Sequence, residues 1–336
     1  MLPFASMSVR ALVTGGAGFL GSHLCERLLS SGREVVCLDD LSTGRLDNVA
    51  QLLTRPGFEF VAHDVAAPCT NRVAAASEIY HLASPAAPMA YQRDRVRTLK
   101  TNVLGTLRAL EAAQAWNARL LLASTSEVYG DPEEHPQSEA YRGAVASIGP
   151  RACYDNAKRA AETLASDYAQ QYGVPVRIAR IFSTYGPRMR ADDGRMVATF
   201  IAAALNDAPI PITVYGDGAQ TRTLCYVADL IDGLVRLLAS DDAGHYPVNL
   251  GADTELTVLA IAQRVVRHAR SRSPIVFQPL PQHDPRRRRP VLARARAVIG
   301  WQPTTPLADG LDATIEHFRH ELDVTTATTN EEKLCA

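Results

Sequence analysis

The sequence contains no hydrophobic run long enough to cross a bilayer, only three lysines and almost no net charge. A membrane-spanning helix needs about 20 consecutive apolar residues, so we expect no membrane partner. The formal net charge of −1 at pH 7 leaves no overall positive field that would attract nucleic acid. The 336 residues, 46% of them hydrophobic, instead predict an ordinary globular protein with a large core.

The six cysteines show no paired spacing of the kind that binds zinc or forms a disulfide framework. We therefore expect no metal site and a reducing compartment. The first residues are too few for a secretory leader and run directly into a strand pattern, so the sequence predicts a cytoplasmic protein. The cysteines are Cys25, Cys37, Cys69, Cys153, Cys225 and Cys335.

Short apolar runs alternate with longer helical patterns through the first half of the chain. Runs that are apolar throughout are typical of parallel strands whose two faces are both covered. Strands that alternate with helices of period 3.6 predict a doubly wound α/β architecture of the Rossmann type. The predicted strands cover Val9–Thr14, Glu34–Asp39, Phe58–Val61, Glu78–Ala83, Arg119–Ser124 and Val176–Phe182.

Residues 1–182 are predicted to form this Rossmann domain, and residues 183–322 a smaller mixed α/β domain for substrate. The pattern changes after Phe182 to a mixture punctuated by glycine and proline. One further strand near 247–251 is expected to return to the first sheet. Residues 323–336 are polar and rich in threonine and glutamate, which predicts a disordered tail.

Three elements are predicted inside the second domain. Apolar periodicity indicates a helix at Met196–Asn206 and a last helix at Leu307–Leu322. Two strand-like runs joined by a glycine-containing turn indicate a hairpin around Thr213–Leu224.

A glycine-rich turn follows the first predicted strand. Gly15, Gly18 and Gly21 stand three residues apart where that strand meets the first helix. Glycines permit a tight bend there and let backbone amides and the positive helix end approach a pyrophosphate. Asp39 ends the second strand, where its carboxylate can accept hydrogen bonds from an adenosine ribose and would repel a phosphate. The sequence therefore predicts a dinucleotide site that prefers NAD to NADP.

One of the rare lysines lies four residues after a tyrosine. Tyr154 and Lys158 begin a clear helix, and this spacing places both side chains on one face. An ammonium near a phenol favours the phenolate, which lowers the pKa of the tyrosine toward that of a general base. The pair is predicted to be catalytic, although a surface pair on a helix would look similar.

Polar side chains also end the fifth predicted strand. Thr125, Ser126 and Glu127 emerge at its carboxyl end, where ligands bind in such sheets. A hydroxyl there can hydrogen-bond a reacting alcohol, and Glu127 can act as an acid or base or orient a substrate carboxylate. Serine and threonine at a strand end can equally cap the next turn, so both interpretations stay open.

These motifs resemble the extended short-chain dehydrogenase/reductase family. Within it, the chain is most similar to the branch of UDP-glucuronate decarboxylases, also called UDP-xylose synthases. The resemblance runs from about Arg10 to Leu322. Its most specific stretches include TGGAGFLGSH at 14–23, HLASP at 81–85, GPRACYD at 149–155 and YGDGAQTR at 215–222.

The resemblance implies a role for each candidate catalytic residue. Tyr154 would take the proton of the sugar C4 hydroxyl, with Lys158 tuning it and Thr125 sharing the hydrogen bond. Oxidation at C4 makes the C6 carboxylate a β-keto acid, which decarboxylates readily. Glu127 and Arg288 would handle that carboxylate and protonate C5, and NAD would be regenerated in each cycle.

The resemblance also implies two sets of binding residues. Tyr154 and Lys158 are expected to contact NAD as well, with Lys158 on the nicotinamide ribose. Further contacts to NAD are expected from Phe19, Leu20, Asp64, Val65, Leu82 and Ala83. The nucleotide sugar, UDP-glucuronate, is expected to contact Tyr91, Ser126, Ser183, Arg195, Val197, Tyr215, Arg222 and Arg288. Among these, Arg222 and Arg288 are assigned to the diphosphate because guanidinium groups suit phosphate oxygens.

The chain departs from the branch pattern at several places. Ser183 replaces an asparagine of the diphosphate site, and Val291 stands where an aspartate is usual. Met89-Ala90 replace Pro-Asn, and Asn156-Ala157 replace Glu-Gly in the catalytic helix. A changed sugar pocket could alter the choice between UDP and TDP or release the 4-keto pentose before reduction.

Other activities remain open from the sequence. A nucleotide-sugar 4-epimerase or 4,6-dehydratase would use the same redox core, but a dehydratase would want an acidic pair after Thr125. A silent NAD-binding sensor would not need both Tyr154 and Lys158. Relatives pair through the helices that here carry Asn102–Gln114 and Tyr154–Gln171, so a homodimer is expected.

Overall fold

The computed structural model describes residues 9–68, 73–192, 194–206, 210–280 and 286–334. Two of the cysteines, Cys69 and Cys335, lie outside these residues. The other four are free thiols, at Cys25, Cys37, Cys153 and Cys225.

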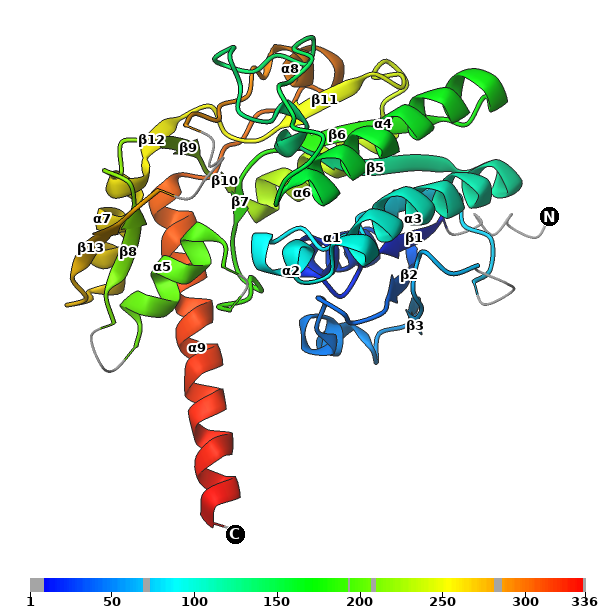
Figure 1. The fold of residues 1–336 in the computed structure, drawn as a ribbon. Helices are drawn as coiled ribbons and strands as arrows, with labels where there is room; N and C mark the ends of the chain where they lie inside the picture. The colour runs from blue at the N-terminus through cyan, green and yellow to red at the C-terminus, as the bar shows by residue number, and fades with distance from the viewer. Residues whose placement is uncertain (1–8, 69–72, 193, 207–209, 281–285, 335–336) are drawn as a thin grey trace.

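A seven-stranded parallel sheet forms the centre of the molecule, in the order β11-β6-β5-β4-β1-β2-β3 (Figure 1). The predicted doubly wound α/β fold is therefore confirmed, and β11 pairs with β6 as the expected return strand. The strands are β1 (Arg10–Thr14), β2 (Glu34–Asp39), β3 (Phe58–Ala62), β4 (Glu78–His81), β5 (Arg119–Thr125), β6 (Val176–Ile181) and β11 (Pro247–Leu250).

Both faces of the sheet are buried in its central strands, which explains why β1, β2 and β5 read as mostly apolar runs. On β1, Ala11 and Val13 point into a core shared with α1 (Phe19–Ser30) and α6 (Val227–Ala239). Leu12 between them points into a second core beneath α3 (Arg95–Trp116) and α4 (Ala152–Tyr172). Helices α3 and α4 lie side by side along this face (Figure 1).

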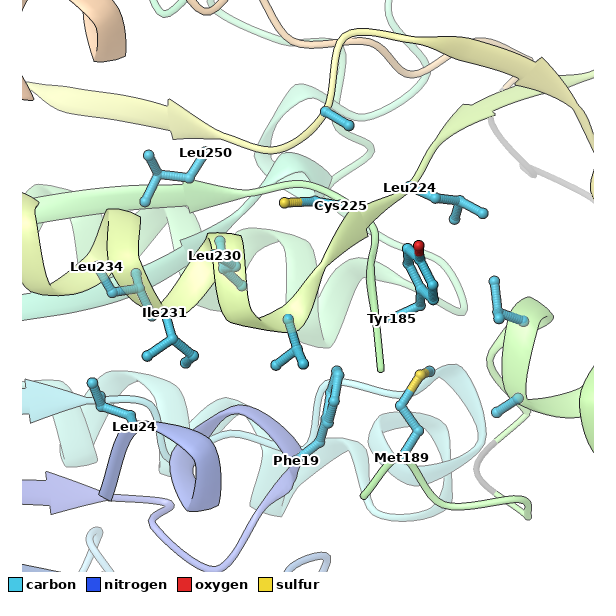
Figure 2. Packing of buried hydrophobic residues seen from close by; sticks show 14 of the residues in the cluster. Phe19, Leu24, Tyr185, Met189, Leu224, Cys225, Leu230, Ile231, Leu234 and Leu250 are labelled. Carbon is cyan, nitrogen blue, oxygen red and sulfur yellow. The ribbon is translucent and has the colours of Figure 1, made fainter. Parts of the chain in front are cut away.

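The first core also contains residues from the second half of the chain, which pack against residues from the first half. Figure 2 shows Leu230, Ile231 and Leu234 of α6 on one side, with Phe19 and Leu24 of α1 across from them. These five side chains are at most 7% exposed. Residues before and after the predicted boundary at 182 thus share one continuous core.

The predicted hairpin around Thr213–Leu224 is wrong. β8 (Ile212–Tyr215) pairs in parallel with β13 (Ile275–Gln278), whereas β9 (Thr221–Thr223) pairs in antiparallel fashion with β12 (Glu255–Thr257). The turn between β8 and β9 does contain glycines with positive φ, at Gly216 and Gly218. Each of the two strands nevertheless pairs with a strand from farther along the sequence and not with the other.

The last helix is longer than predicted. α9 extends from Leu307 to Leu334 and projects beyond the body of the molecule (Figure 1), where a disordered tail was expected after Leu322. The sequence 323–334 contains neither glycine nor proline, so no residue in it breaks the helix. No helix within the described ranges is both long and apolar enough to cross a membrane.

The remaining elements complete the chain between these landmarks. The predicted helix at Met196–Asn206 is found as α5 (Met196–Ala204). The others are η1 (Leu46–Leu52), α2 (Pro88–Arg93), η2 (Ser126–Tyr129), β7 (Thr184–Tyr185), β10 (Cys225–Tyr226), α7 (Val258–Ala269) and α8 (Ala293–Ile299).

Candidate active site

The glycine-rich turn connects β1 to α1. Gly15 has a φ of +71°, and a Cβ on it would lie 2.8 Å from the backbone nitrogen of Ala83. Gly18 precedes the first residue of α1, and no side chain caps that helix end. The amides at this end are therefore open to an anion, which fits the pyrophosphate of a dinucleotide.

Asp39 lies directly behind this turn. Its carboxylate accepts hydrogen bonds from the amide of Ala17 at 3.0 Å and from that of Leu41 at 2.8 Å. A Cβ on Gly44 would lie 2.8 Å from the carboxylate. Burial raises the pKa of Asp39, while the two amides act to lower it. The carboxylate is thus fixed beside the turn, in a position that suits the ribose of a dinucleotide.

The other predicted cofactor residues gather at the same edge of the sheet. Leu82 and Ala83 follow β4, and the amide of Leu82 donates to the Thr14 carbonyl at 3.1 Å. Asp64 and Val65 follow β3, and the Asp64 carboxylate accepts from the amide of Ala66 at 2.9 Å. Phe19 and Leu20 are the first two residues of α1. The structure therefore brings the whole predicted cofactor set to one sheet edge.

Tyr154 and Lys158 lie one turn apart on α4 and are both buried, with 4% and 3% exposed surface. Thr125, the last residue of β5, acts on the acidity of the Tyr154 phenol. The Lys158 ammonium donates to the carbonyl of Ala123 in β5 at 2.8 Å. The Thr125 hydroxyl accepts from the amide of Glu127 at 3.2 Å, so Thr125 both caps the next turn and acts on the tyrosine.

The acidity of the pair differs from the prediction. Burial raises the pKa of Tyr154, with the Thr125 hydrogen bond acting in the opposite direction. Burial also lowers the pKa of Lys158 to about 8. The lowered tyrosine pKa expected from a neighbouring ammonium is therefore not found in the chain alone, because desolvation of the phenolate outweighs other effects.

Glu127 is held between two arginines. Arg288 forms a two-pronged ion pair with its carboxylate, with the Nη2–Oε2 contact at 2.7 Å, and also donates to the Gly130 carbonyl at 3.3 Å. Arg151 pairs with the same carboxylate. Sequence reasoning gave Arg151 no role, although it lies in the GPRACYD stretch at 149–155 and four residues before Asp155. We call Arg151, Glu127 and Arg288 the guanidinium clamp.

Burial and the charges of the clamp set the pKa values of two carboxyl groups, Glu127 and Asp155. Burial acts to raise the pKa of Glu127, but Arg288 and Arg151 outweigh it and lower the value to about 2. Burial raises the pKa of Asp155 to about 7, and the Glu127 charge adds to this shift. Near neutral pH the clamp therefore holds one carboxylate between two guanidiniums and has a net positive charge.

Tyr91 faces the tyrosine of the pair. The rings of Tyr91 and Tyr154 stack with centroids 5.1 Å apart and an angle of 4° between their planes. Tyr91 is only 1% exposed, and burial raises its pKa to about 12. The predicted substrate residue thus packs on the predicted base. Ser126 is also buried at the end of β5.

The remaining predicted substrate residues lie around the second domain. The amide of Thr221 in β9 donates to the Arg286 carbonyl at 3.0 Å, which brings the strand that carries Arg222 against the segment that carries Arg288. Ser183 and Tyr215 are exposed. The Arg195 guanidinium lies 5.5 Å from the Phe19 ring centroid, and Val197 is buried in α5. Of the two arginines assigned to the diphosphate, Arg288 contacts Glu127. Arg222 lies in β9, next to the segment that carries Arg288.

Comparison with known proteins agrees with this geometry. Residues 11–251 match the model of the NAD dependent epimerase/dehydratase family. UDP-glucuronic acid decarboxylase 1 from Danio rerio is 51% identical over 94% of this chain and 73% of its own length. UDP-glucuronic acid decarboxylase 5 from Arabidopsis thaliana is 47% identical over 96% of this chain and 92% of its own length.

Solved structures share the fold. UDP-glucuronic acid 4-epimerase from Bacillus cereus, in complex with UDP-glucuronic acid and NAD, matches with a TM-score of 0.83 and 28% identity over 93% of this chain and 99% of its own. UDP-glucose 4-epimerase from Thermus thermophilus, in complex with NAD, matches with a TM-score of 0.79 and 29% identity over 93% and 99% of the two chains. The chain belongs to the NAD dependent epimerase/dehydratase family.

Proposed function

We propose that this enzyme decarboxylates UDP-glucuronate through a 4-keto intermediate and yields UDP-xylose. The observation that carries the proposal is the guanidinium clamp next to the Tyr154–Thr125 pair. Oxidation of an alcohol by Tyr154 and Thr125 does not itself require the guanidinium clamp. A positively charged clamp at the same strand end suits a substrate that also carries a carboxylate.

In the first half-reaction, the oxidation of the sugar at C4, three side chains have separate roles. Tyr154 takes the C4 hydroxyl proton, Thr125 shares the hydrogen bond, and Lys158 holds the nicotinamide ribose. When bound, NAD supplies the hydride acceptor and a cationic ring that favours the phenolate. The turn at Gly15, Gly18 and Gly21 and the Asp39 carboxylate are the groups that would hold it.

The clamp acts in the second half. A C4 ketone withdraws electrons from the C5–C6 bond, so CO2 leaves and an enolate remains. Arg288 and Arg151 stabilise the negative charge on the sugar, and a proton is added at C5. Tyr154 then returns its proton to O4 as the ketone is reduced. We assign Tyr91, Arg195, Val197, Tyr215 and Arg222 to the remaining contacts with the nucleotide sugar.

The decisive experiment is incubation of the purified protein with UDP-glucuronate, followed by mass analysis of the nucleotide sugar and measurement of CO2. Loss of CO2 together with a UDP-pentose supports the proposal. A 4-epimerase would give an isomer of unchanged mass, a dehydratase a loss of water, and a silent NAD-binding sensor no turnover. The same reaction with TDP-glucuronate reports the nucleotide preference, and a ketone product reports release before reduction.

We also propose that the enzyme is a cytoplasmic homodimer that pairs through α3 and α4. Apolar side chains remain exposed on α3 at helical spacing: Val96 is 65% exposed, Leu99 45% and Leu104 39%. An apolar helix face of this kind fits association with a second copy. The four described cysteines are free thiols, which agrees with a reducing compartment.

A further inference from the structure

The proposed reaction consumes one proton in each cycle, and this inference rests on that function. The proton that Tyr154 removes from O4 returns to O4 when the ketone is reduced. Decarboxylation breaks the C5–C6 bond and leaves its electron pair on the sugar, and a new C5–H bond uses that pair. The proton for C5 is therefore supplied from outside the redox pair, and the site needs a path for it from solvent.

A pocket leads from the surface to the guanidinium clamp. Its mouth is lined by exposed residues, among them Asp131, Ala146 and Ile148, the last 91% exposed. Arg151 also lines it, and at its buried end are Asp155, 6% exposed, and Arg288, 6% exposed. The pocket thus approaches the clamp from outside, where water can enter.

Asp155 is the acid at the buried end of this pocket. Its side chain is 8% exposed, and its Oδ2 lies 3.9 Å from Nε of Arg151. Its Oδ1 is buried and has no hydrogen-bond partner in the described part of the chain. A buried carboxylate oxygen without a partner is costly. Protonation of Asp155 would remove the buried charge, and a water molecule at Oδ1 would give this oxygen a partner.

We propose that Asp155 is the proton relay that connects solvent in this pocket to the guanidinium clamp, from which C5 of the sugar is protonated. The O–H bond at Asp155 breaks as the C5–H bond forms, by way of water at the clamp, and solvent then protonates Asp155 again. Asp155 does not touch the sugar. It is a positioning residue that holds the proton for the groups that do.

The charges around Asp155 support this role. Its pKa is raised to about 7, first by burial and then by the Glu127 carboxylate, while Arg151 and Arg288 act to lower it. Asp155 can therefore hold and release a proton near neutral pH, whereas Glu127, with a pKa lowered to about 2, cannot. The titratable groups that interact electrostatically with it are Arg151, which directly precedes α4, Cys153 and Tyr154 from α4, Glu127 from η2, Tyr91 from α2, and Arg288.

Rapid mixing of the NAD-loaded enzyme with UDP-glucuronate tests the relay. Reduced-nicotinamide fluorescence rises as C4 is oxidised and falls as the ketone is reduced. With Asp155→Asn, we expect an unchanged rise with the same dependence on UDP-glucuronate concentration, and a fall slowed about 100-fold, as for a lost general acid. In the unsubstituted enzyme, the rate of the fall decreases as pH rises through about 7, and this dependence disappears in Asp155→Asn.

Two further variants separate the relay from a structural role. Asp155→Glu keeps an acid and is expected to restore the fall and its pH dependence, whereas Asp167→Asn, on an exposed part of α4, changes neither phase. Equal slowing of both phases in Asp155→Asn, with the pH dependence retained, overturns the proposal. If neither Asp155 variant folds, a fall rate in the unsubstituted enzyme that stays constant through this pH range overturns it instead. Absence of CO2 from the unsubstituted enzyme would count against the proposed function and not against the relay alone.

Discussion

At the level of single residues, charge compensation governs the candidate site. Glu127 stays ionised in a mostly buried position because two guanidiniums face it. Asp155, which lies 3.9 Å from Nε of Arg151, has a raised pKa because it is buried and because the Glu127 charge adds to the effect of burial, while Arg151 and Arg288 act to lower it. Neighbouring carboxylates with such different acidity can take different roles in one reaction.

Replacement of Tyr154 by Phe removes the proposed base while it keeps the ring that stacks on Tyr91. We expect kcat to fall by about 10³-fold, within the range for loss of general acid–base catalysis, with little change in NAD affinity. Steady-state kinetics and calorimetric titration with NAD measure the two effects. Wild-type turnover in this variant would remove Tyr154 from the mechanism.

Replacement of Glu127 by Gln leaves the two arginines of the clamp without their anion. We expect a loss of about 3 kcal/mol in the free energy of unfolding at neutral pH, as for other broken buried ion pairs. Because the folded pKa of Glu127 is depressed to about 2 from 4.5, this stabilisation is complete above about pH 4.5 and is lost as pH falls through about 2.

Urea unfolding of Glu127→Gln and the unsubstituted protein across this acidic range tests the dependence. The exposed Glu133 provides a matched control, and its change to Gln is expected to have little effect at any pH. A difference between Glu127→Gln and the unsubstituted protein that does not shrink toward low pH would contradict the assigned charge state.

Sequence reasoning found some residues of the site and missed others for clear reasons. Lys158 was conspicuous because lysine is rare here, and its spacing to Tyr154 fits one helix face. Arg151 had no comparable signal in a chain rich in arginine. The contact between Arg288 and Glu127 joins residues 161 positions apart in the chain, which no local pattern specifies.

At the level of elements, the turn between β1 and α1 depends on close backbone approach. A Cβ on Gly21 would lie 2.0 Å from the Gly15 carbonyl oxygen. We expect Gly21→Ala to displace the turn and weaken NAD binding by at least about tenfold, or about 1.4 kcal/mol. Calorimetric titration with NAD measures the change.

Gly32→Ala is the control for this substitution. Gly32 has a φ of +84°, but a Cβ added there would meet no atom of the described residues within 4 Å. The substitution is therefore expected to cost about 1 kcal/mol of stability through backbone strain and to leave NAD affinity unchanged. Equal NAD affinity in the two variants would refute the importance of the Gly21 contact.

The elements that the sequence predicted best are the strands of the central sheet. Each was placed within about two residues, because most of these strands are buried and read as largely apolar runs, although the edge strand β3 is only partly buried. The hairpin at Thr213–Leu224 was wrong because pairing of β8 with β13 and of β9 with β12 is decided by distant segments. The end of α9 was misplaced because composition alone does not mark where a helix without glycine or proline stops.

At the level of the whole molecule, the exposed face of α3 predicts self-association. The double substitution Val96→Glu and Leu99→Glu places charge on this face, and we expect the proposed dimer to dissociate. Sedimentation velocity measures the mass of the particle. Phe277→Glu, at a 52% exposed site on β13, is the control and should keep the mass of the unsubstituted protein. A dimer that survives the double substitution would place the interface elsewhere.

The return of β11 to the edge of the sheet has a consequence for biosynthesis. Until the ribosome has made residues 247–250, the growing chain carries β6 with an unpaired outer edge. Unpaired strand edges can pair with strands of other chains. Helix α6, which covers the apolar face of α1, is also synthesised after Phe182. The nascent first half is therefore a natural client for chaperones, and a gene fragment that stops after Phe182 would yield an aggregating product.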